Sequence, residues 1–586
     1  MSAFSERVDG FLAEFFRLSP INATAAGNHD HDAIWPDMTE AGRQERLAFV
    51  DRWEAELKSL PGLSPDEAID RDLLLMELDA ARFQETELRE ECWNPLEWIY
   101  LMGGGIFPLL ARDFAPLADR LTSIAGRVEG LPALVDAAKD NLKGVAGRPV
   151  GKFQTETALN QLPGIVELAD DAVHEAETNA SDDAEVEVLL PRVRAAAETA
   201  KSALSDFETH LRDVVLPASD GDGRLGAELF TRKMRHTMRS DQLTPDRILT
   251  EAEREFGAVR AEMVRLAREA WPEWCPGREP PDDETQLVRG VLDAIAADHP
   301  GPSDILDFCR DELARIEAFC RAHNVIGLAE EPLEIRWTPV FMRSFGGAML
   351  DAPGPLDKGQ KTFFSVTPVP DDWTEDQVES YMREDNARML RLLTIHEAVP
   401  GHYLQGVYAN RTQSLPRAVF WSGVFAEGWA VYITQVMMDL GYGADDPALL
   451  LTHWKFYLRS ATNAILDARI HVDGIGEEEA MRLMVEGGFQ EESEARAKYN
   501  RARLSSTQLS TYFVGSMEFW EIERDARRRA AEASGDPRGA AAVPASRIVG
   551  GLDPTPGFDY RAHLESVLSH GSPPTTLLRR LVLGEA

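Results

Sequence analysis

The chain has 586 residues and is 44% hydrophobic, enough to bury a sizeable core, and it has no run of about 18 uncharged apolar residues that would span a membrane. Its 61 Lys and Arg residues against 99 Asp and Glu residues give a formal net charge of -38, an acidic balance that argues against nucleic acids and anionic membranes as partners. The four cysteines form no CxxC pair, which argues against a disulfide scaffold and a cysteine zinc cluster.

The beginning of the chain, MSAFSERVDGFLAEFF, is charged and amphipathic and has no uninterrupted apolar core of a signal peptide. We therefore expect a cytoplasmic location. Shortly afterwards, His29, Asp30, His31 and Asp32 place four metal-ligating side chains in a row. Their polar surroundings near a terminus favour an exposed loop over a metal site.

Helical periodicity dominates most of the sequence, with apolar residues recurring every three or four positions. Breaks rich in Pro, Gly and Asp separate the helical runs, and the clearest is PASDGDGRLG, from Pro217 to Gly226. The pattern predicts a mainly α fold that forms one unit over residues 1–586. Within it we expect an N-terminal helical lobe over residues 1–216 and a catalytic lobe over residues 227–586.

Residues 333–369 interrupt the helical pattern. LEIRWTPVF and TFFSVTPVP are rich in aromatic and β-branched residues, and DKGQ, from Asp357 to Gln360, is the expected turn between them. These segments predict a small β-sheet. An exposed edge strand of such a sheet can hold an extended peptide through main-chain hydrogen bonds.

A helix is expected to begin at Thr374, where Gln377 completes a capping box three residues later. We expect this helix to continue without interruption to His396. Its apolar side chains would face a core, and they are Val378, Tyr381, Met382, Met389, Leu390, Leu393 and Ile395.

The segment TIHEAVPGHYLQ resembles the HExxH metal-binding pattern, but its second histidine comes two residues late. On a regular helix, residues i and i+4 share a face, whereas His402 at i+6 would point about 240° away from His396. Pro400 has no N–H to donate to the carbonyl of His396, and Gly401 tolerates backbone angles that other residues resist. We predict that the helix departs from regular geometry between Glu397 and His402, so that both imidazoles reach one ion. The alternative is a helix that ends at Pro400, with His402 in the following loop.

A second segment, VFWSGVFAEGWAVYI, contains a single charged residue, Glu427. The segment is too short to span a bilayer and is therefore predicted to be a buried helix, in which an unpaired carboxylate would be costly. Glu427 follows His402 by 25 positions, enough for one helix, a turn and a return. Two histidines and a glutamate form the ligand set of a catalytic zinc site with one position left for water. The alternative is that Glu427 is only an ion-pair partner.

HEAVPGHYLQ together with EGWAVY resembles the two signatures of the bacterial domain of unknown function 885 family. GDGRLGAELF and HLESVLSHGSPPTTLL also resemble that family, so the likeness extends over nearly the whole chain. The family is distantly similar to the zinc oligopeptidases of the thimet and neurolysin kind and to thermostable zinc carboxypeptidases. The resemblance implies a zincin-like, two-lobed helical shell around a deep channel, with the small sheet at 333–369 next to zinc helices at 375–440.

The resemblance also implies roles for the residues of the two signatures. His396, His402 and Glu427 would be the ligands of Zn²⁺, and Glu397 would be the general base. A carboxylate beside the first ligand can accept a proton from the water that the metal activates.

Other resemblances suggest further site residues. QLSTYFVG resembles the tyrosine-bearing segment of the family and makes Tyr512 the expected donor to the oxyanion, with Tyr499 as the second choice. Either tyrosine is alternatively a half-buried core aromatic. LDARIH matches the family at Asp467 and His471, which would line the site or support it, and we count His471 with Tyr512 among the catalytic candidates.

The sequence also departs from the family's pattern. Relatives usually carry arginines and a glycine where this chain has Ser460, Asn463 and Arg469. Thr434 stands where a glutamate is common, and Ser506 where a proline is common. The metal-binding set is intact, while the residues expected to face the substrate are altered, which leaves the identity of the substrate open.

The sequence therefore predicts a zinc metallohydrolase, a metallopeptidase of the gluzincin kind that cleaves amide bonds of short peptides with a metal-activated water. One alternative is an amidase or hydrolase of a small non-peptide metabolite on the same scaffold. Another is a metal-binding protein that has lost catalysis. An intact Glu397 argues against the latter, because a site that only binds metal has no use for a base.

Overall fold

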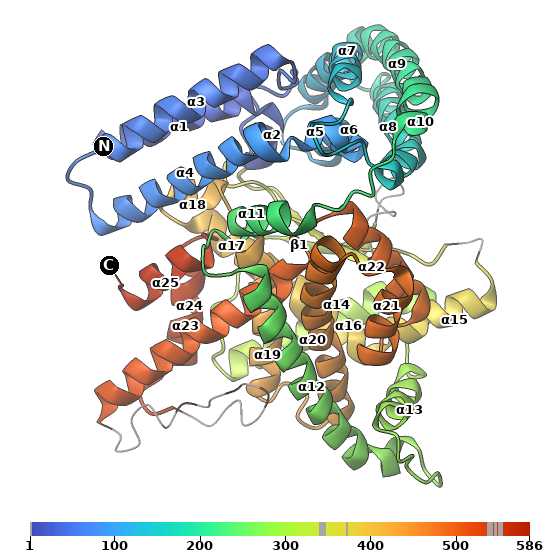
Figure 1. The fold of residues 1–586 in the computed structure, drawn as a ribbon, viewed down its shortest axis with the longest axis vertical. Coiled ribbons are helices and arrows are strands. Elements are labelled where there is room, and N and C mark those ends of the chain that lie inside the picture. The colour runs from blue at the N-terminus through green and yellow to red at the C-terminus, as the bar shows by residue number, and fades with distance from the viewer. Residues whose placement is uncertain are drawn as a thin grey trace. The chain divides into compact units, whose positions relative to one another are not determined.

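The fold is known from a computed structural model, which describes residues 3–338, 347–370, 373–535, 543, 546, 548 and 555–585. Most of these residues are helical, and the described strands form one small sheet (Figure 1). This confirms the predicted mainly α fold with a small sheet. Among the described helices, none combines the length and the apolar character that crossing a membrane requires.

The chain divides into two compact units. The first contains Met1–Arg224 and Pro353–Gln360, and the second contains Leu225–Ala352 and Lys361–Ala586. The first boundary, between Arg224 and Leu225, lies within the predicted break at 217–226. Residues 353–360 belong to the first unit although they lie within the segment 333–369 that was predicted to form the sheet.

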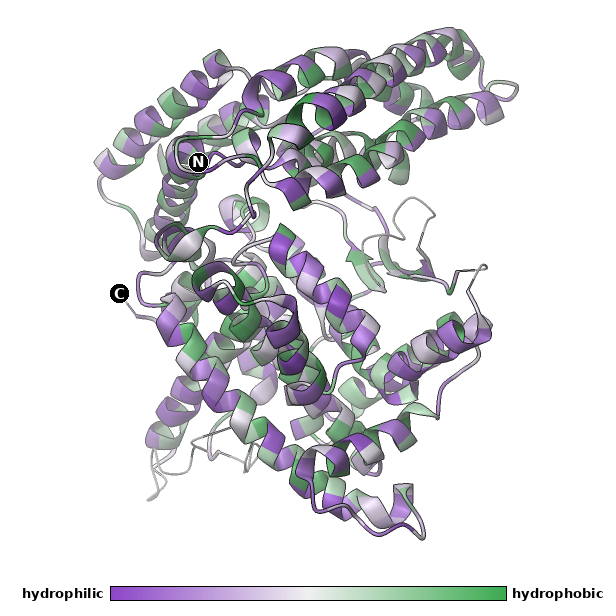
Figure 2. Cartoon of the chain, turned by 45° about the vertical axis from the view of Figure 1, so that its right-hand side comes forward, coloured by the Kyte–Doolittle hydropathy of each residue, from purple (hydrophilic) through white to green (hydrophobic). Residues whose placement is uncertain are grey.

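The first unit is built from helices. They are α1 (Ala3–Leu18), α2 (Pro20–Ala26), α3 (Glu40–Ser59), α4 (Pro65–Phe83), α5 (Glu90–Trp93), α6 (Pro95–Ala111), α7 (Leu117–Asn141), α8 (Lys152–Asn179), α9 (Ala184–His210) and α10 (Leu216–Ala218), with π-helical turns at Gln84–Leu88 and Leu211–Val215. Most are amphipathic, and Figure 2 shows hydrophilic and hydrophobic residues interleaved along them. In α4, for example, Ser64 and Glu67 form a capping box, and Leu73, Leu74 and Leu78 are buried.

Residues 353–360 pack against the loop that follows α2, within the first unit. The N–H of Leu356 donates to the carbonyl oxygen of Ala26 at 2.9 Å. His29 contacts two carboxylates, with Nδ1 2.7 Å from Asp32 and Nε2 3.1 Å from Asp357. Asp32 is only 2% exposed, so the prediction that residues 29–32 form an exposed loop was wrong for this residue. The hydroxyl of Thr24 donates to Asp32 at 2.6 Å, and Arg127 lies 3.8 Å from its carboxylate, a partner distant in sequence that no local pattern reveals.

Because His29 contacts Asp357, we predict that the packing of residues 353–360 against the first unit depends on pH. Burial disfavours its charged form, but hydrogen bonds to Asp32 and Asp357 outweigh burial and raise the pKa of His29 to about 9. The stabilisation is therefore complete below the unfolded pKa of about 6.5 and is lost as the pH rises through about 9. We expect His29→Gln to speed amide hydrogen exchange of residues 353–360 at pH 7 by about 10-fold. This factor corresponds to about one unit of the pKa shift of His29, the part that remains after allowance for its partial exposure to solvent.

The measurement is hydrogen exchange by mass spectrometry at pH 7 and pH 10, corrected for intrinsic exchange rates. The difference between the variant and the wild type should shrink at pH 10, where His29 is neutral in both states. His31→Gln removes a neighbouring imidazole and should leave the segment protected. Equal exchange of His29→Gln and wild type at pH 7 would show that the ion pair does not hold the segment.

The second unit contains the remaining helices and the sheet. Its helices are α11 (Gly226–Met238), α12 (Pro245–Trp274), α13 (Glu284–Ala296), α14 (Ile305–Ala322), α15 (Glu375–Glu384), α16 (Ala387–Glu397), α17 (His402–Arg411), α18 (Leu415–Val419), α19 (Gly423–Asp439), α20 (Pro447–Ala468), α21 (Glu477–Met481), α22 (Glu492–Leu504), α23 (Ser510–Ser534), α24 (Tyr560–Ser569) and α25 (Thr575–Leu583). Short 3₁₀ and π turns lie at Pro302–Asp304, Arg469–Asp473 and Arg482–Gly487.

The sheet contains β1 (Leu333–Trp337), β2 (Ala348–Asp351) and β3 (Thr362–Val366) in the order β1-β3-β2. β3 is parallel to β1 and antiparallel to β2. The turn predicted at DKGQ therefore does not join two adjacent antiparallel strands, and β2 was not foreseen. The end of the first predicted strand, residues 339–341, lies outside the described residues.

The sheet and the helix that carries His396 share one core. Ile335 of β1 and Phe364 of β3 pack in the same buried cluster as Cys309 of α14 and Leu390 of α16. All four side chains are 5% exposed or less. The sheet thereby packs against α16 and holds the helix that carries His396 in place.

The helix predicted to run from residue 374 to His396 is in fact two helices. The capping box of Thr374 and Gln377 at the start of α15 is confirmed. α15 ends at Glu384, and Asn386 begins α16 by accepting hydrogen bonds from two backbone N–H groups of its first turn. Asparagine is a preferred N-cap residue because its side chain satisfies these free donors. The prediction of one uninterrupted helix was therefore wrong.

Candidate metal centre

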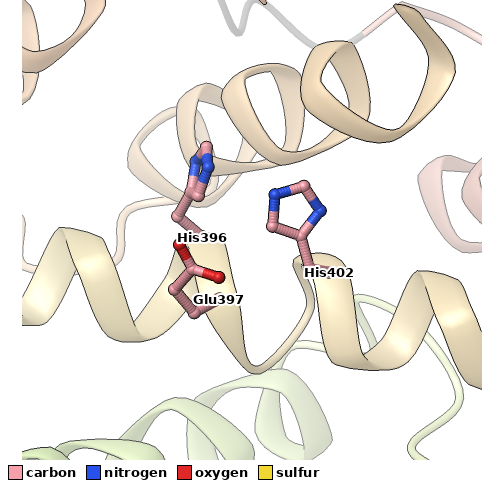
Figure 3. A group of neighbouring side chains, drawn as sticks. All are labelled: His396, Glu397 and His402. Carbon is pink, nitrogen blue, oxygen red and sulfur yellow. The ribbon is translucent and has the colours of Figure 1, made fainter. Parts of the chain in front are cut away.

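The helix leaves regular geometry between the two histidines. α16 ends at Glu397, the Val399–Pro400 peptide bond is cis, and α17 begins at His402. Figure 3 shows the ribbon leaving the helix after Glu397 and re-entering one at His402. The predicted departure from helical geometry is confirmed. It is larger than expected, because the first helix ends before Pro400 and His402 opens a new helix.

Gly401 is required at this break by close packing. A Cβ atom at this position would lie 1.9 Å from the carbonyl oxygen of His396 and 2.3 Å from that of Ile395. The φ angle of Gly401 is -75°, which any residue can adopt. The close approach of the backbone to α16, and not the sign of φ, therefore requires glycine at this position.

We expect Gly401→Ala to weaken zinc binding by about 10- to 100-fold. The added methyl group must push the backbone away from His396, and overpacking of this kind costs about 1–3 kcal/mol. The measurement is a competition titration with a zinc chelator. Gly406→Ala is the matched control, because its Cβ would come no closer than 3.8 Å to another atom. If Gly401→Ala binds zinc as tightly as the wild type, the break tolerates this shift and our explanation of it is wrong.

A residue of the EGWAVY segment contacts the interruption between α16 and α17. The indole Nε1–H of Trp429, on α19, donates to the carbonyl oxygen of Pro400 at 2.9 Å, and Trp429 is fully buried. This role of Trp429 was not predicted from the sequence. A buried indole needs an acceptor, so the Trp within EGWAVY signalled a partner without identifying it. The two motifs are thus joined by a hydrogen bond as well as by their candidate ligands.

The break brings two imidazoles and a carboxylate together. One potential ligand atom each from His396, Glu397 and His402 lies within 4.8 Å of the other two. The two imidazole rings are 4.8 Å apart at their centroids and are nearly perpendicular. In Figure 3 both rings project from the same side of the backbone. Oε2 of Glu427, from α19, lies 3.5 Å from Nε2 of His402. The structure therefore brings together all four residues that the sequence singled out here.

These residues fit a zinc ion. The donor set contains two imidazoles and a glutamate, the combination found in catalytic zinc sites. Nδ1 of His396 is buried and makes no hydrogen bond of normal geometry with the described residues. The backbone of Ala430 lies nearby and acts to raise the pKa of His396, against the larger effect of burial. An imidazole nitrogen left in this way is rare in protein interiors, and a metal ion would satisfy it.

The electrostatics of the cluster point the same way. Burial, together with the neighbouring His402, lowers the pKa of His396 to about 3, so its imidazole is neutral and able to bind a metal. Burial and the nearby carboxylate of Glu427 raise the pKa of Glu397 to about 7, against the opposing effect of His402. The carboxylates of Glu397 and Glu427 thus both lie close to the imidazole of His402. A divalent cation would stabilise the ionised form of both.

Two glycines set the distance between the helices that carry Glu427 and Tyr512. A Cβ atom at Gly428 of α19 would lie 2.3 Å from Cα of Gly515 on α23, so the two backbones touch. Tyr512 lies one turn before Gly515, and its hydroxyl is close enough to Glu427 to lower the pKa of that carboxyl by hydrogen bonding. The close crossing therefore places the predicted oxyanion donor beside a candidate ligand.

We expect Gly515→Ala to lower the melting temperature and to separate Tyr512 from Glu427. The Cβ atom of an alanine at position 515 would lie 2.1 Å from the carbonyl oxygen of Val424. Overpacking of this kind lowers the free energy of unfolding by about 1–3 kcal/mol. Thermal unfolding and zinc titration measure both effects. Gly257→Ala, in the middle of α12 with no atom within 4 Å of its Cβ, should be neutral or slightly stabilising. Equal melting of both variants would contradict the role of the crossing.

His471 and Asp467 support the approach to α23. Nε2 of His471 lies 2.8 Å from the carbonyl oxygen of Ser505. Asp467 is fully buried and accepts hydrogen bonds from the backbone N–H groups of Thr507 and Ser510. Their described hydrogen bonds are thus with the segment before Tyr512 and not with the cluster around His396, and the ring of His471 also stacks on Phe230. Of the two roles considered from sequence, this geometry favours support over direct contact with a substrate.

The other sequence candidates also have identifiable surroundings. Tyr499 is 6% exposed and packs in a hydrophobic cluster with Leu466 and Ile470, as expected of a core aromatic. Among the positions that depart from the family's pattern, Arg469 hydrogen-bonds Glu253 at 2.6 Å. The hydroxyl of Thr434 donates to a carbonyl of its own helix.

The remaining departures also lie in the second unit. Ser460 donates to the carbonyl oxygen of Tyr457, and Ser506 accepts from Lys233 at 2.9 Å. Asn463 is 7% exposed, and its Oδ1 has no hydrogen-bond partner among the described residues. None of these described hydrogen bonds involves the four residues of the cluster.

Comparisons with known proteins identify relatives over the full chain. The family model described as "Bacterial protein of unknown function (DUF885)" matches residues 20–582. The solved structure of a "putative lipoprotein of unknown function" from Shewanella oneidensis is 31% identical, with a TM-score of 0.81 and 100% of each chain covered. A "putative lipoprotein" from Colwellia psychrerythraea is 16% identical, with a TM-score of 0.76, 97% of this chain and 96% of that chain covered, and shows the same fold. No curated protein matches the sequence.

Proposed function

The chain belongs to the DUF885 family of bacterial proteins, and on this premise we propose that it is a zinc-dependent hydrolase that cleaves amide bonds of short peptides. The observation that carries the proposal is the buried group of His396, Glu397 and His402, with Glu427 beside it. A site for metal storage or structure would need only the ligands. A further carboxylate adjacent to the first ligand supports catalysis.

In this proposal each side chain has a distinct role. His396, His402 and Glu427 hold the ion, which when bound supplies Lewis acidity and makes a water easier to deprotonate. Glu397 accepts the proton of the attacking water and transfers it to the leaving amine. Tyr512 donates a hydrogen bond to the oxygen that gains negative charge at the scissile carbonyl. Before substrate binds, this hydroxyl would donate to Glu427, and it would turn from that carboxylate to the substrate oxygen.

The supporting residues act on position. Trp429 fixes the carbonyl of Pro400, and the contact of Gly428 with Gly515 sets the spacing of α19 and α23. Asp467 and His471 hold the segment before Tyr512. Small errors in the position of catalytic groups cost large factors in rate, so these contacts matter although they do not touch the substrate.

We propose that the second unit is zincin-like and distantly similar to the thimet and neurolysin kind of oligopeptidase, with α16, α17 and α19 carrying the ligands.

We also propose a cytoplasmic location, which cell fractionation would test against a membrane-anchored one. The composition supports neither nucleic acid nor membrane as a partner.

The test is a peptide-library assay on the purified protein, with metal content measured in parallel. We expect one zinc per chain, cleavage of short peptides, loss of cleavage after chelation and its return when zinc is added. If the zinc-loaded protein cleaves small amides but no peptide, the alternative amidase function is favoured. If it binds zinc and cleaves neither class, the proposal of hydrolysis is wrong.

A further inference from the structure

An arginine lies next to the candidate site on the side of Tyr512. Arg501 is near the end of α22, and its Nη2 donates to Oε1 of Gln508 at 2.9 Å. The same nitrogen is 3.5 Å from the hydroxyl oxygen of Tyr512. Because Tyr512 also contacts Glu427, a single side chain separates the guanidinium from a candidate metal ligand.

The charge of Arg501 is not neutralised by a described carboxylate. Its hydrogen-bond partners, Gln508 and Tyr512, are both uncharged. One turn earlier on the same helix, Lys498 does have an acidic partner, with its Nζ 3.7 Å from Glu494. The described hydrogen bonds of Arg501 thus leave its positive charge without an acidic partner. Most of its five N–H donors remain available to a ligand.

The chemistry of the guanidinium indicates the ligand. Arginine binds a carboxylate through two parallel N–H···O bonds, and this fixes both the position and the direction of the carboxylate. A peptide carries one carboxylate whatever its sequence, at its C-terminus. That group lies one residue beyond the last peptide bond, at a spacing of about 3.8 Å between Cα atoms. Arg501 and Glu427 both lie beside the hydroxyl of Tyr512, so a carboxylate bound by the guanidinium would lie near the candidate metal ligands.

We propose that Arg501 binds the terminal α-carboxylate of a peptide, so that the enzyme removes residues from the C-terminus. This inference rests on the proposed hydrolase function and specifies its substrate. In the reaction, the C–N bond of the last peptide bond breaks and the oxygen of water bonds to the carbonyl carbon. One proton of that water passes to the amine that leaves. The released amino acid departs with the carboxylate that Arg501 held.

A second role of Arg501 makes a different prediction. Through its contact with the phenolic oxygen, Arg501 would only keep Tyr512 in place. Loss of Arg501 would then slow the cleavage of every substrate by the same factor. A carboxylate-binding role instead affects substrates with a free C-terminus selectively.

The experiment compares two versions of one short peptide, with a C-terminal acid or a C-terminal amide, on the zinc-loaded full-length protein. We expect the wild type to favour the acid by about 10- to 100-fold in kcat/KM, the range for a hydrogen-bonded charged group. Arg501→Gln should bring this ratio close to 1, chiefly by raising KM for the acid. Arg501→Lys should restore part of the preference.

Arg496→Gln is the matched control, because Arg496 is an exposed arginine on the same helix and pairs with Glu477 and Glu492. It removes the same charge from an acidic protein and should leave the preference unchanged. A wild type that cleaves acid and amide equally would overturn the proposal for Arg501 and leave the hydrolase function standing. An Arg501→Gln variant that slows both substrates equally would overturn it as well.

A binding measurement separates the failure of this inference from the failure of the hydrolase function. The Glu397→Gln variant, with and without Arg501→Gln, is titrated by calorimetry with both forms of the peptide. Tighter binding of the acid that disappears with Arg501→Gln supports carboxylate binding by Arg501, and a wild type that then cleaves neither peptide contradicts the hydrolase function alone. Equal binding of acid and amide in the presence of Arg501 contradicts carboxylate binding.

Discussion

Glu397→Gln is expected to leave the zinc content unchanged and to lower kcat by about 10²–10⁴-fold, the usual contribution of a general base. The substitution keeps the size of the side chain and removes only its ability to accept a proton. His396 and His402 are untouched, and Glu427 remains beside His402. The loss should therefore appear in the rate and not in the metal stoichiometry. Elemental analysis and steady-state kinetics on a cleaved peptide measure the two quantities.

The control for this prediction is Glu518→Gln, which makes the same change at a partly buried carboxyl of α23 outside the cluster. It should retain normal kcat. If Glu397→Gln keeps near-normal kcat on a true substrate, Glu397 is not the base. If it loses its zinc, the carboxylate acts as a ligand, which its closeness to both imidazoles makes the competing role.

Simultaneous replacement of His396, His402 and Glu427 by alanine is expected to reduce bound zinc from one ion per chain to none, and to abolish hydrolysis. Each single replacement should weaken zinc binding by more than about 100-fold, because changes in the residues behind metal ligands already cost about 10- to 100-fold. The measurements are elemental analysis after dialysis and chelator competition.

His323→Ala is the control for the loss of an imidazole. His323 follows α14, is exposed and stacks on Phe319. This variant should bind one zinc per chain with unchanged affinity. Full metal stoichiometry in the triple variant would place the metal elsewhere in the protein. Such a result would also remove the basis for the role of Glu397.

The local part of the site was predictable from the sequence. Pro400 lacks an N–H donor and Gly401 lacks a Cβ atom, and both properties act within one turn of His396. The spacing alone indicated that a regular helix would separate the two imidazoles. The capping box at Thr374 was predictable for the same reason, since it involves only neighbouring residues.

Contacts between distant segments were not predictable. The hydrogen bond from Trp429 to Pro400 and the crossing of Gly428 with Gly515 depend on how three helices pack. The parallel pairing of β1 with β3 likewise depends on register over a long connection. Asn386 illustrates an intermediate case. It is a recognisable N-cap residue, but the apolar pattern on both sides of it was consistent with one continuous helix.

Residues 353–360 have a consequence for dividing the protein into fragments. Because this segment belongs to the first unit while its flanking strands belong to the second, the chain passes from one unit to the other three times. A recombinant fragment ending at Arg224 would lack Asp357, which pairs with His29. It would also lack Leu356, whose N–H donates to the carbonyl oxygen of Ala26. Separate expression of the first unit therefore requires residues 353–360 to be supplied, by fusion or as a peptide. A single protease cut after Arg224 would leave that unit assembled from two chains.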